Sequence, residues 1–310
     1  MKKILTAFAL VAILSSCQKE ISIDTNSPYT SGNGGGGSGN GNSGNNSGLL
    51  IKTVSVSGTE TQTTVYTYDS QKRLETMTMS GTSGGLPVDT YTKYIRDNSG
   101  RIVLVKQTAP KLMPGASVDT ATNTYHYPNA TTQNFDYSIY VITMNVAGMS
   151  MSTIDSAVYH YTAAGKMTSF HKYMSSSLMP GSIQMTSRYD FTYDASDRVT
   201  NMKLFTDLSN PGGPLDQDTE WKYTYGATGV NNGYTTNNGA QNFALNGLPN
   251  TTSNYISKME VNSPSTTPPL NLVSTFTYVN GANNKPVSGT VVTVTSGQPT
   301  QTANYTFFYQ

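Results

Sequence analysis

The architecture of this chain follows from a repeated motif that first appears as Tyr66-Thr67-Tyr68-Asp69-Ser70-Gln71-Lys72-Arg73-Leu74. Alternating tyrosine and threonine give the period of two that is typical of a β-strand with one covered face. Asp69 follows, and an aspartate at the start of a turn can hydrogen-bond its own backbone. Alternation resumes after Arg73. The motif therefore predicts a β-hairpin with a four-residue turn over 69–72.

The motif returns along the chain. Clear copies are Tyr94-Ile95-Arg96-Asp97-Asn98-Ser99-Gly100-Arg101-Ile102, Tyr159-His160-Tyr161-Thr162-Ala163-Ala164-Gly165-Lys166-Met167 and Phe191-Thr192-Tyr193-Asp194-Ala195-Ser196-Asp197-Arg198-Val199, and weaker copies begin at Tyr125, Tyr223, Phe276 and Phe307. Most successive copies lie 28 to 34 residues apart. Repetition at such a period indicates an array of identical units, here one hairpin after another.

The repeat gives structural roles to side chains that would look catalytic in isolation. The expected structural turn residues are Asp69, Arg73, Asp97, Gly100, Arg101, Gly165, Lys166, Asp194 and Arg198. The glycines stand last in the turn, where a positive φ is favoured. We expect the basic residue after each turn to lie over the last tyrosine before it in the same hairpin, as Arg73 over Tyr68.

Proline and glycine gather between the hairpins and predict longer, irregular turns at the opposite edge of the sheet. These segments are Gly84–Pro87, Leu112–Gly115, Leu178–Gly181, Asn210–Pro214 and Pro264–Pro269. We therefore expect an all-β fold over residues 49–310. It would be a large antiparallel meander of about 16 strands, curved or closed into a barrel-like sheet so that its edges are covered.

The N-terminus has the form of an export signal. Two lysines precede the apolar run Ile4–Leu14, which is too short to span a bilayer, and Leu14-Ser15-Ser16-Cys17 ends it. Cys17 is the only cysteine, so the folded part forms no disulfide. The Leu-Ser-Ser-Cys ending resembles the lipobox of bacterial lipoproteins, which implies a signal peptide over 1–17 and lipidation of Cys17. Residues 18–48, rich in Gly, Ser and Asn, predict a flexible tether.

The hairpin motif resembles the YD repeats of the RHS family. It is more similar to exported Bacteroidota lipoproteins that carry such hairpins in a domain with a porin-like sheet. This resemblance implies an outer-membrane lipoprotein, and Gln18-Lys19-Glu20 is similar to the signal that sends such proteins to the cell surface; the periplasmic face is the alternative. Asp119-Thr120-Ala121 and Asp155-Ser156-Ala157 resemble the O-glycosylation sequon of that phylum.

Few residues suggest chemistry. Charged residues make up 12% of the chain and the net charge is +1, which argues against a nucleic-acid partner. His126, His160 and His171 are expected to be strand residues, with His171 out of register with His160. The carboxylates of Asp216–Glu220 lack the pattern of a calcium loop. No catalytic motif is present, so we expect a protein that is not an enzyme and has no metal or cofactor.

About 16 strands and the aromatic run Tyr305–Tyr309 near the C-terminus are also features of a membrane-spanning porin. A spanning barrel needs an apolar outer band, but Lys93 or Asp190 stands where that band should be, so we predict a sheet that does not span the membrane. The expected role is non-enzymatic binding or scaffolding, through the long-turn edge or a tyrosine face, with a glycan or another envelope protein as partner. A glycan-binding or glycan-processing surface protein is the alternative.

Overall fold

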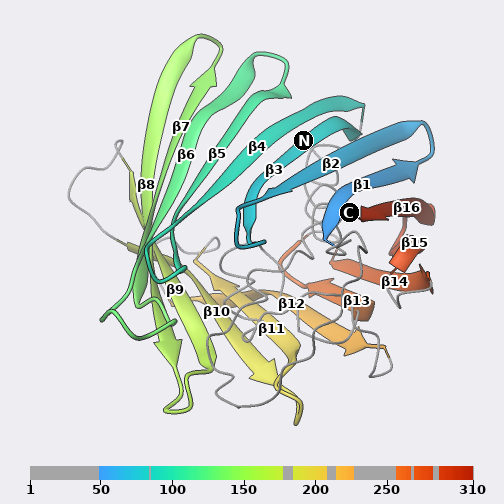
Figure 1. Cartoon of the computed structure of the whole chain (residues 1–310). Coiled ribbons are helices and arrows are strands. Elements are labelled where there is room, and N and C mark those ends of the chain that lie inside the picture. The colour runs from blue at the N-terminus through green and yellow to red at the C-terminus, as the bar shows by residue number, and fades with distance from the viewer. Residues whose placement is uncertain are drawn as a thin grey trace, which may run out of the picture.

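The protein folds as a closed barrel of 16 antiparallel strands. The computed structural model describes residues 49–83, 85–176, 184–207, 214–226, 256–266, 269–281 and 286–309. Each strand pairs with its neighbours in the chain, and β1 (Leu50–Ser57) pairs with β16 (Gln301–Tyr309) to close the sheet (Figure 1). The prediction of about 16 antiparallel strands is confirmed, and the sheet is closed rather than merely curved.

The strands are 8 to 13 residues long. Between β1 and β16 the chain forms β2 (Glu60–Tyr68), β3 (Leu74–Ser83), β4 (Leu86–Arg96), β5 (Ile102–Met113), β6 (Ala116–His126), β7 (Tyr137–Val146), β8 (Met149–Tyr161), β9 (Met167–Ser176), β10 (Gln184–Tyr193), β11 (Val199–Thr206), β12 (Asp216–Tyr225), β13 (Ile256–Ser263), β14 (Leu270–Asn280) and β15 (Pro286–Thr295). No helix within these ranges is long and apolar enough to cross a membrane. The predicted signal peptide, Cys17 and the tether lie outside the described residues.

The barrel has two distinct ends. We call one the aspartate-turn end; it carries the turns over residues 69–73, 97–101, 162–166 and 194–198. The opposite end, which we call the proline end, carries the turns over 58–59, 114–115 and 147–148. Leu50 at the start of β1 faces Tyr309 at the finish of β16. Both ends of the barrel segment therefore lie at the aspartate-turn end.

Some of the turns differ in length from the sequence expectation, although the connection 264–269 between β13 and β14 is long as predicted. Pro114 and Gly115 alone join β5 to β6, with Gly115 at φ 76°, and Ala147 and Gly148 join β7 to β8 with φ of 51° and 84°. Ala147 and Gly148 both have a positive φ, which matches the right-handed twist of the flanking strands and favours such a short hairpin. The aspartate turns, predicted to be the tight ones, have five residues. Of the predicted proline turns, 178–181 and 210–213 lie outside the described residues.

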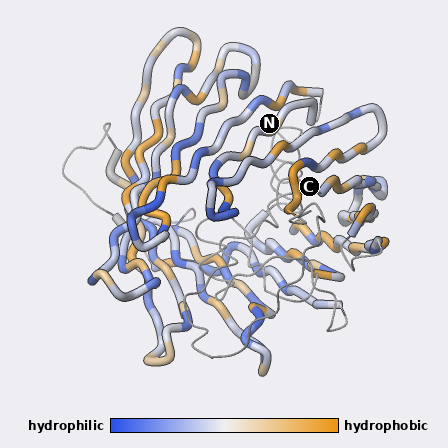
Figure 2. Tube along the Cα trace, in the orientation of Figure 1, coloured by the Kyte–Doolittle hydropathy of each residue, from blue (hydrophilic) through white to orange (hydrophobic). Residues whose placement is uncertain are grey.

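One face of each strand forms the core. In β2 the side chains of Gln62, Thr64 and Tyr66 are buried, whereas Val65 and Thr67 at the alternate positions are exposed. Side chains converge on the concave face of a closed sheet, so we place the buried set inside the barrel. Figure 2 shows the resulting alternation of polar and apolar residues along the strands.

The core is concentrated toward the aspartate-turn end. In β8, Ala157 and Tyr159 are buried near that end, while Met149 and Met151 near the proline end are exposed. The long β6–β7 connection adds Phe135, which is 1% exposed and packs 4.5 Å from the ring centroid of Tyr159. Residues outside the strands thus help to fill this end of the barrel.

The second tyrosine of the motif joins neighbouring hairpins. At the aspartate-turn end no turn connects β9 to β10. There the hydroxyl of Tyr193 donates a hydrogen bond of 2.6 Å to the carbonyl of Met167, the first residue of β9. The same bond, which we call the tyrosine latch, recurs from Tyr68 to Leu50, Tyr127 to Ile102, Tyr161 to Phe135 and Tyr225 to Val199. These five latches secure the open ends of the seams that they cross.

The basic side chains also act between hairpins, contrary to the expectation. The guanidinium of Arg101 lies 4.4 Å from the ring centroid of Tyr127, and that of Arg198 lies 4.9 Å from Tyr225. The reason is that each turn has one residue more than expected. Lys72 has a left-handed φ of 62°, which shifts the register of the hairpin. Tyr68 therefore faces Leu74 rather than Arg73. The rings that accept the cations belong to the next motif copy.

Removing one latch tests its contribution to stability. In Tyr193→Phe the Met167 carbonyl loses its donor, so we expect the free energy of unfolding to fall by about 1 kcal/mol, the usual net value of such a bond. Denaturant titration of the full chain measures this change. The control Tyr91→Phe removes a hydroxyl from a tyrosine that is 39% exposed and should change stability by less than about 0.5 kcal/mol. Equal effects of the two variants would show that the latch adds nothing.

Candidate functional site

The aspartate turns are closed structural units. The Asp69 backbone makes two turn bonds, accepting from Lys72 N–H at 2.9 Å and donating to Arg73 O at 2.9 Å. Its Oδ1 accepts from the N–H groups of Gln71 and Arg73, and its Oδ2 accepts from Arg73 Nε at 2.8 Å. Both carboxylate oxygens are therefore engaged within the turn, which leaves this group poorly suited to acid–base catalysis.

The other predicted turn residues occupy equivalent places. Asp97 pairs with Arg101 and Asp194 with Arg198 through the same set of bonds. In the turn over 162–166 Thr162 replaces the aspartate, and Lys166 forms an ion pair with Asp197 of the next hairpin instead. The aspartate–arginine bonds therefore lie within single turns, whereas the Lys166–Asp197 ion pair joins two neighbouring turns.

Gly100 has a backbone conformation that favours glycine. It has a φ of 85°, and a Cβ placed on it would lie 2.6 Å from Nη1 of Arg73. Gly165 has a φ of 80° in the corresponding place. A side chain at Gly100 would thus strain the backbone and force the end of the Arg73 side chain to shift.

The turns lower the pKa of their aspartates. Partial burial alone would raise the pKa of the Asp97 carboxyl, but hydrogen bonds from the side chain and backbone of Arg101 outweigh it and hold the pKa below its ordinary value. Burial likewise opposes the bonds from Arg73 to Asp69 and from Arg198 to Asp194, and the pKa of each carboxyl is again lowered. These aspartates stay ionised at neutral pH.

The remaining candidate residues do not assemble a catalytic or calcium site. Glu220 accepts a bond of 2.7 Å from Asn201 Nδ2 and pairs with Lys222, while Asp218 accepts from Ser265. In the part of the chain that the structure describes, no three His, Cys, Asp or Glu side chains could hold a metal ion together. The carboxylates of this strand are held by separate partners.

The histidines differ from the expectation in one respect. His126 stacks on Tyr137 with ring centroids 4.1 Å apart, but His160 and His171 contact each other across β8 and β9 with centroids 4.6 Å apart. A bulge at His160 and Tyr161 alters the strand register, and turn counting from the sequence missed it. The sequence analysis therefore did not find the contact between His160 and His171.

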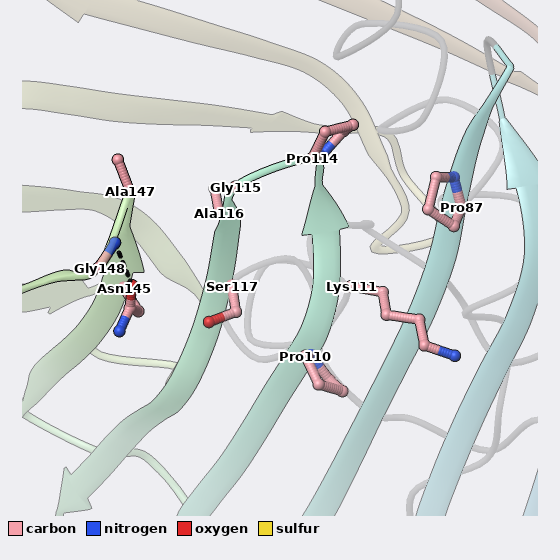
Figure 3. Close-up of a pocket in the computed structure, with 10 residues that line it drawn as sticks. All are labelled: Pro87, Pro110, Lys111, Pro114, Gly115, Ala116, Ser117, Asn145, Ala147 and Gly148. Carbon is pink, nitrogen blue, oxygen red and sulfur yellow. Dashed lines mark hydrogen bonds between the residues drawn. The ribbon is translucent and has the colours of Figure 1, made fainter.

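A groove marks the proline end. It has a volume of about 450 Å³. It is lined by Pro87, Pro110, Lys111, Pro114, Gly115, Ala116, Ser117, Asn145, Ala147 and Gly148 (Figure 3). Short side chains from the hairpins β5–β6 and β7–β8 leave this space, and Asn145 braces the second turn by accepting from Gly148 N–H at 3.0 Å. Lys111 at its edge pairs with Asp89 at 3.6 Å.

Of the two predicted binding surfaces, the tyrosine face is taken up by the core. Tyr66, Tyr94, Tyr125 and Tyr223 are each no more than 5% exposed. The groove, in contrast, is open, and it lies at the edge that the proline and glycine segments predicted. It is the candidate binding site.

Comparison with known proteins finds likeness in fold. No family model and no curated protein matches the chain. Among solved structures, a porin-like protein from Bacteroides vulgatus is similar at 11% identity and a TM-score of 0.47, over 85% of this chain and 99% of that one. A porin-like protein from Bacteroides uniformis is similar at 14% identity and a TM-score of 0.46, over 84% and 98%.

The prediction of a sheet that does not span a membrane is wrong, because it conflicts with these porin-like barrels. That prediction used single outward residues such as Lys93. It overlooked that a closed sheet satisfies all of its strand-to-strand bonds internally, as lipid requires. Strands of 8 to 13 residues also include the length that crosses a bilayer at a tilt.

Acid should weaken the barrel through its turns. Since the folded pKa of Asp97 lies below the unfolded value, near 3.9, its contribution is complete above that value and is lost as pH falls through the folded pKa. We expect unfolding midpoints to drop between about pH 5 and pH 2, and less steeply in Asp97→Asn. The control Asp119→Asn removes a charge from an exposed strand position and should keep the slope of the unmodified protein. A slope unchanged in Asp97→Asn would contradict this account.

Proposed function

We propose that this chain is a non-enzymatic, lipid-anchored protein of the bacterial cell envelope that binds a partner at the proline end of its barrel. The observation that carries the proposal is the open groove of about 450 Å³ at the end opposite the barrel's two chain termini. An anchor joined through residues 18–48 enters at Leu49, so the groove stands on the far side of the barrel from its attachment.

The anchor rests on the sequence. The lysines, the apolar run and the Leu-Ser-Ser-Cys ending support export and lipidation of Cys17. Two or more acyl chains hold a protein stably, since each buried CH₂ contributes about 0.8 kcal/mol. The outer membrane is the proposed location, with the cell surface favoured by Gln18-Lys19-Glu20. Glycosylation at Thr120 or Ser156 stays a prediction.

The lining of the groove favours a protein partner over a glycan. Aromatic rings, on which sugars stack, are absent from its ten lining residues. Three prolines and the small residues Gly115, Ala116 and Gly148 instead form a shallow surface of low side-chain entropy, with Ser117 and Asn145 as polar points. An extended loop of another envelope protein suits this surface.

Lipidation can be measured directly. Mass spectrometry of the mature N-terminal peptide should find acyl chains on Cys17, and Cys17→Ser should carry none. A mature protein that begins elsewhere and lacks Cys17 would contradict the proposed anchor. This readout does not depend on how the barrel itself meets the membrane.

Partner binding can be tested by photo-crosslinking in intact cells. A photoreactive side chain at Ala116 in the groove should give discrete protein adducts, whereas the same group at Ser70, in an aspartate turn, should give none. Filling the groove by Ser117→Trp should reduce the Ala116 adducts at least about tenfold, which corresponds to 1.4 kcal/mol. Adducts that are equal at both sites, or untouched by the tryptophan, would exclude the groove. Binding on a glycan array would favour the carbohydrate alternative.

A further inference from the structure

We propose that His160 and His171 bind a divalent transition-metal ion on the wall of the barrel. They lie on neighbouring strands, where His160 faces Ser169 and His171 faces Val158, so the two histidines are diagonal neighbours on one face. Their ring centroids are 4.6 Å apart. Two imidazoles already in contact can converge on one ion by small side-chain rotations.

Buried side chains on the opposite face of the sheet fix the direction in which the two histidines point. Tyr159 precedes His160 and Phe170 precedes His171, and both aromatic side chains are buried, with ring centroids 5.5 Å apart. Alternation along each strand then directs both histidines away from the core. His160 is exposed and His171 partly exposed, and His160 lies one residue from the end of β8, so an ion can reach the pair from the aspartate-turn end. A core-anchored backbone reduces the entropy lost when both ligands bind one ion.

The nearest positive charge is directed elsewhere. Arg188 faces His171 on β10, but its guanidinium lies 4.3 Å from the ring centroid of Phe205 on β11. Its Nε also pairs with Asp190 at 3.1 Å. The guanidinium thus leans toward β11, and the Asp190 carboxylate offsets its charge near the histidine pair.

The ligand type selects the ion. Imidazole nitrogen suits copper, nickel and zinc, and affinity for a given nitrogen site is highest for Cu²⁺ among the divalent first-row metals. Since the described residues supply no third His, Cys, Asp or Glu ligand to the pair, water would complete the coordination. We therefore infer a two-histidine site that prefers Cu²⁺ over Ni²⁺ and Zn²⁺.

The test is a Cu²⁺ titration of the full chain, made without a polyhistidine tag and with Cys17→Ser to remove the thiol. We expect one ion per chain, with an electron paramagnetic resonance spectrum that shows coupling to two imidazole nitrogens. His160→Asn and His171→Asn should each weaken binding at least about tenfold, the lower limit for loss of even an indirect metal partner. His126→Asn, which removes the histidine stacked on Tyr137, should bind as before.

Three results would overturn the proposal: no binding at micromolar Cu²⁺, unchanged affinity in both His160→Asn and His171→Asn, or equal loss in His126→Asn. Circular dichroism of each variant confirms that the barrel is folded. The nitrogen coupling is read on the chain with all three histidines, so it tests the site even where a variant unfolds.

Discussion

In a barrel built from hairpins, the last strand of one hairpin must pair with the first strand of the next. At one end of the barrel no turn joins these two strands, so side-chain contacts have to hold them together. At the aspartate-turn end the tyrosine latch supplies such a contact. The hydroxyl of Tyr193 donates a hydrogen bond to the carbonyl of Met167, and this is one of five such bonds. The cation of the preceding turn lies over the same ring, as Arg198 does over Tyr225. Five motif copies are thus bound to the preceding part of the sheet, and these contacts hold seams on which closure of the barrel depends.

The same contact explains how the sequence relates to the structure. The period of the motif predicted the strand number, because alternation and turn chemistry are local properties. The partner of each basic residue was predicted wrongly: the left-handed Lys72 adds a residue to the turn, and cross-strand counting cannot see such a bulge. The length of the turn between β5 and β6 was predicted wrongly for a related reason, because the sequence Pro114-Gly115 fits a two-residue hairpin turn as well as a longer loop.

The candidate sites were only partly visible in the sequence. Proline and glycine between hairpins marked the edge that carries the groove, but the volume between β5–β6 and β7–β8 depends on how two hairpins lie side by side. The contact of His160 with His171 likewise depends on a bulge. The tyrosines that looked available for a ligand are buried, because closure turns their face inward. The closure of the sheet also shows why single charged residues on its outer face were a poor reason to predict that it does not span a membrane.

Closure of the barrel is the central claim, and the pairing of β1 with β16 tests it most directly. Val54 and Thr306 face each other in that pair, and antiparallel partners lie within the Cα separation that a disulfide requires. Because Cys17 is the only natural cysteine, Val54→Cys with Thr306→Cys in a Cys17→Ser chain contains no other thiol. Mild oxidation should give a rapid intramolecular disulfide, seen as faster migration in non-reducing denaturing electrophoresis. A sheet that stays reduced under the same oxidant, while Val54→Cys with Thr63→Cys across β1 and β2 forms its disulfide, would contradict a closed barrel.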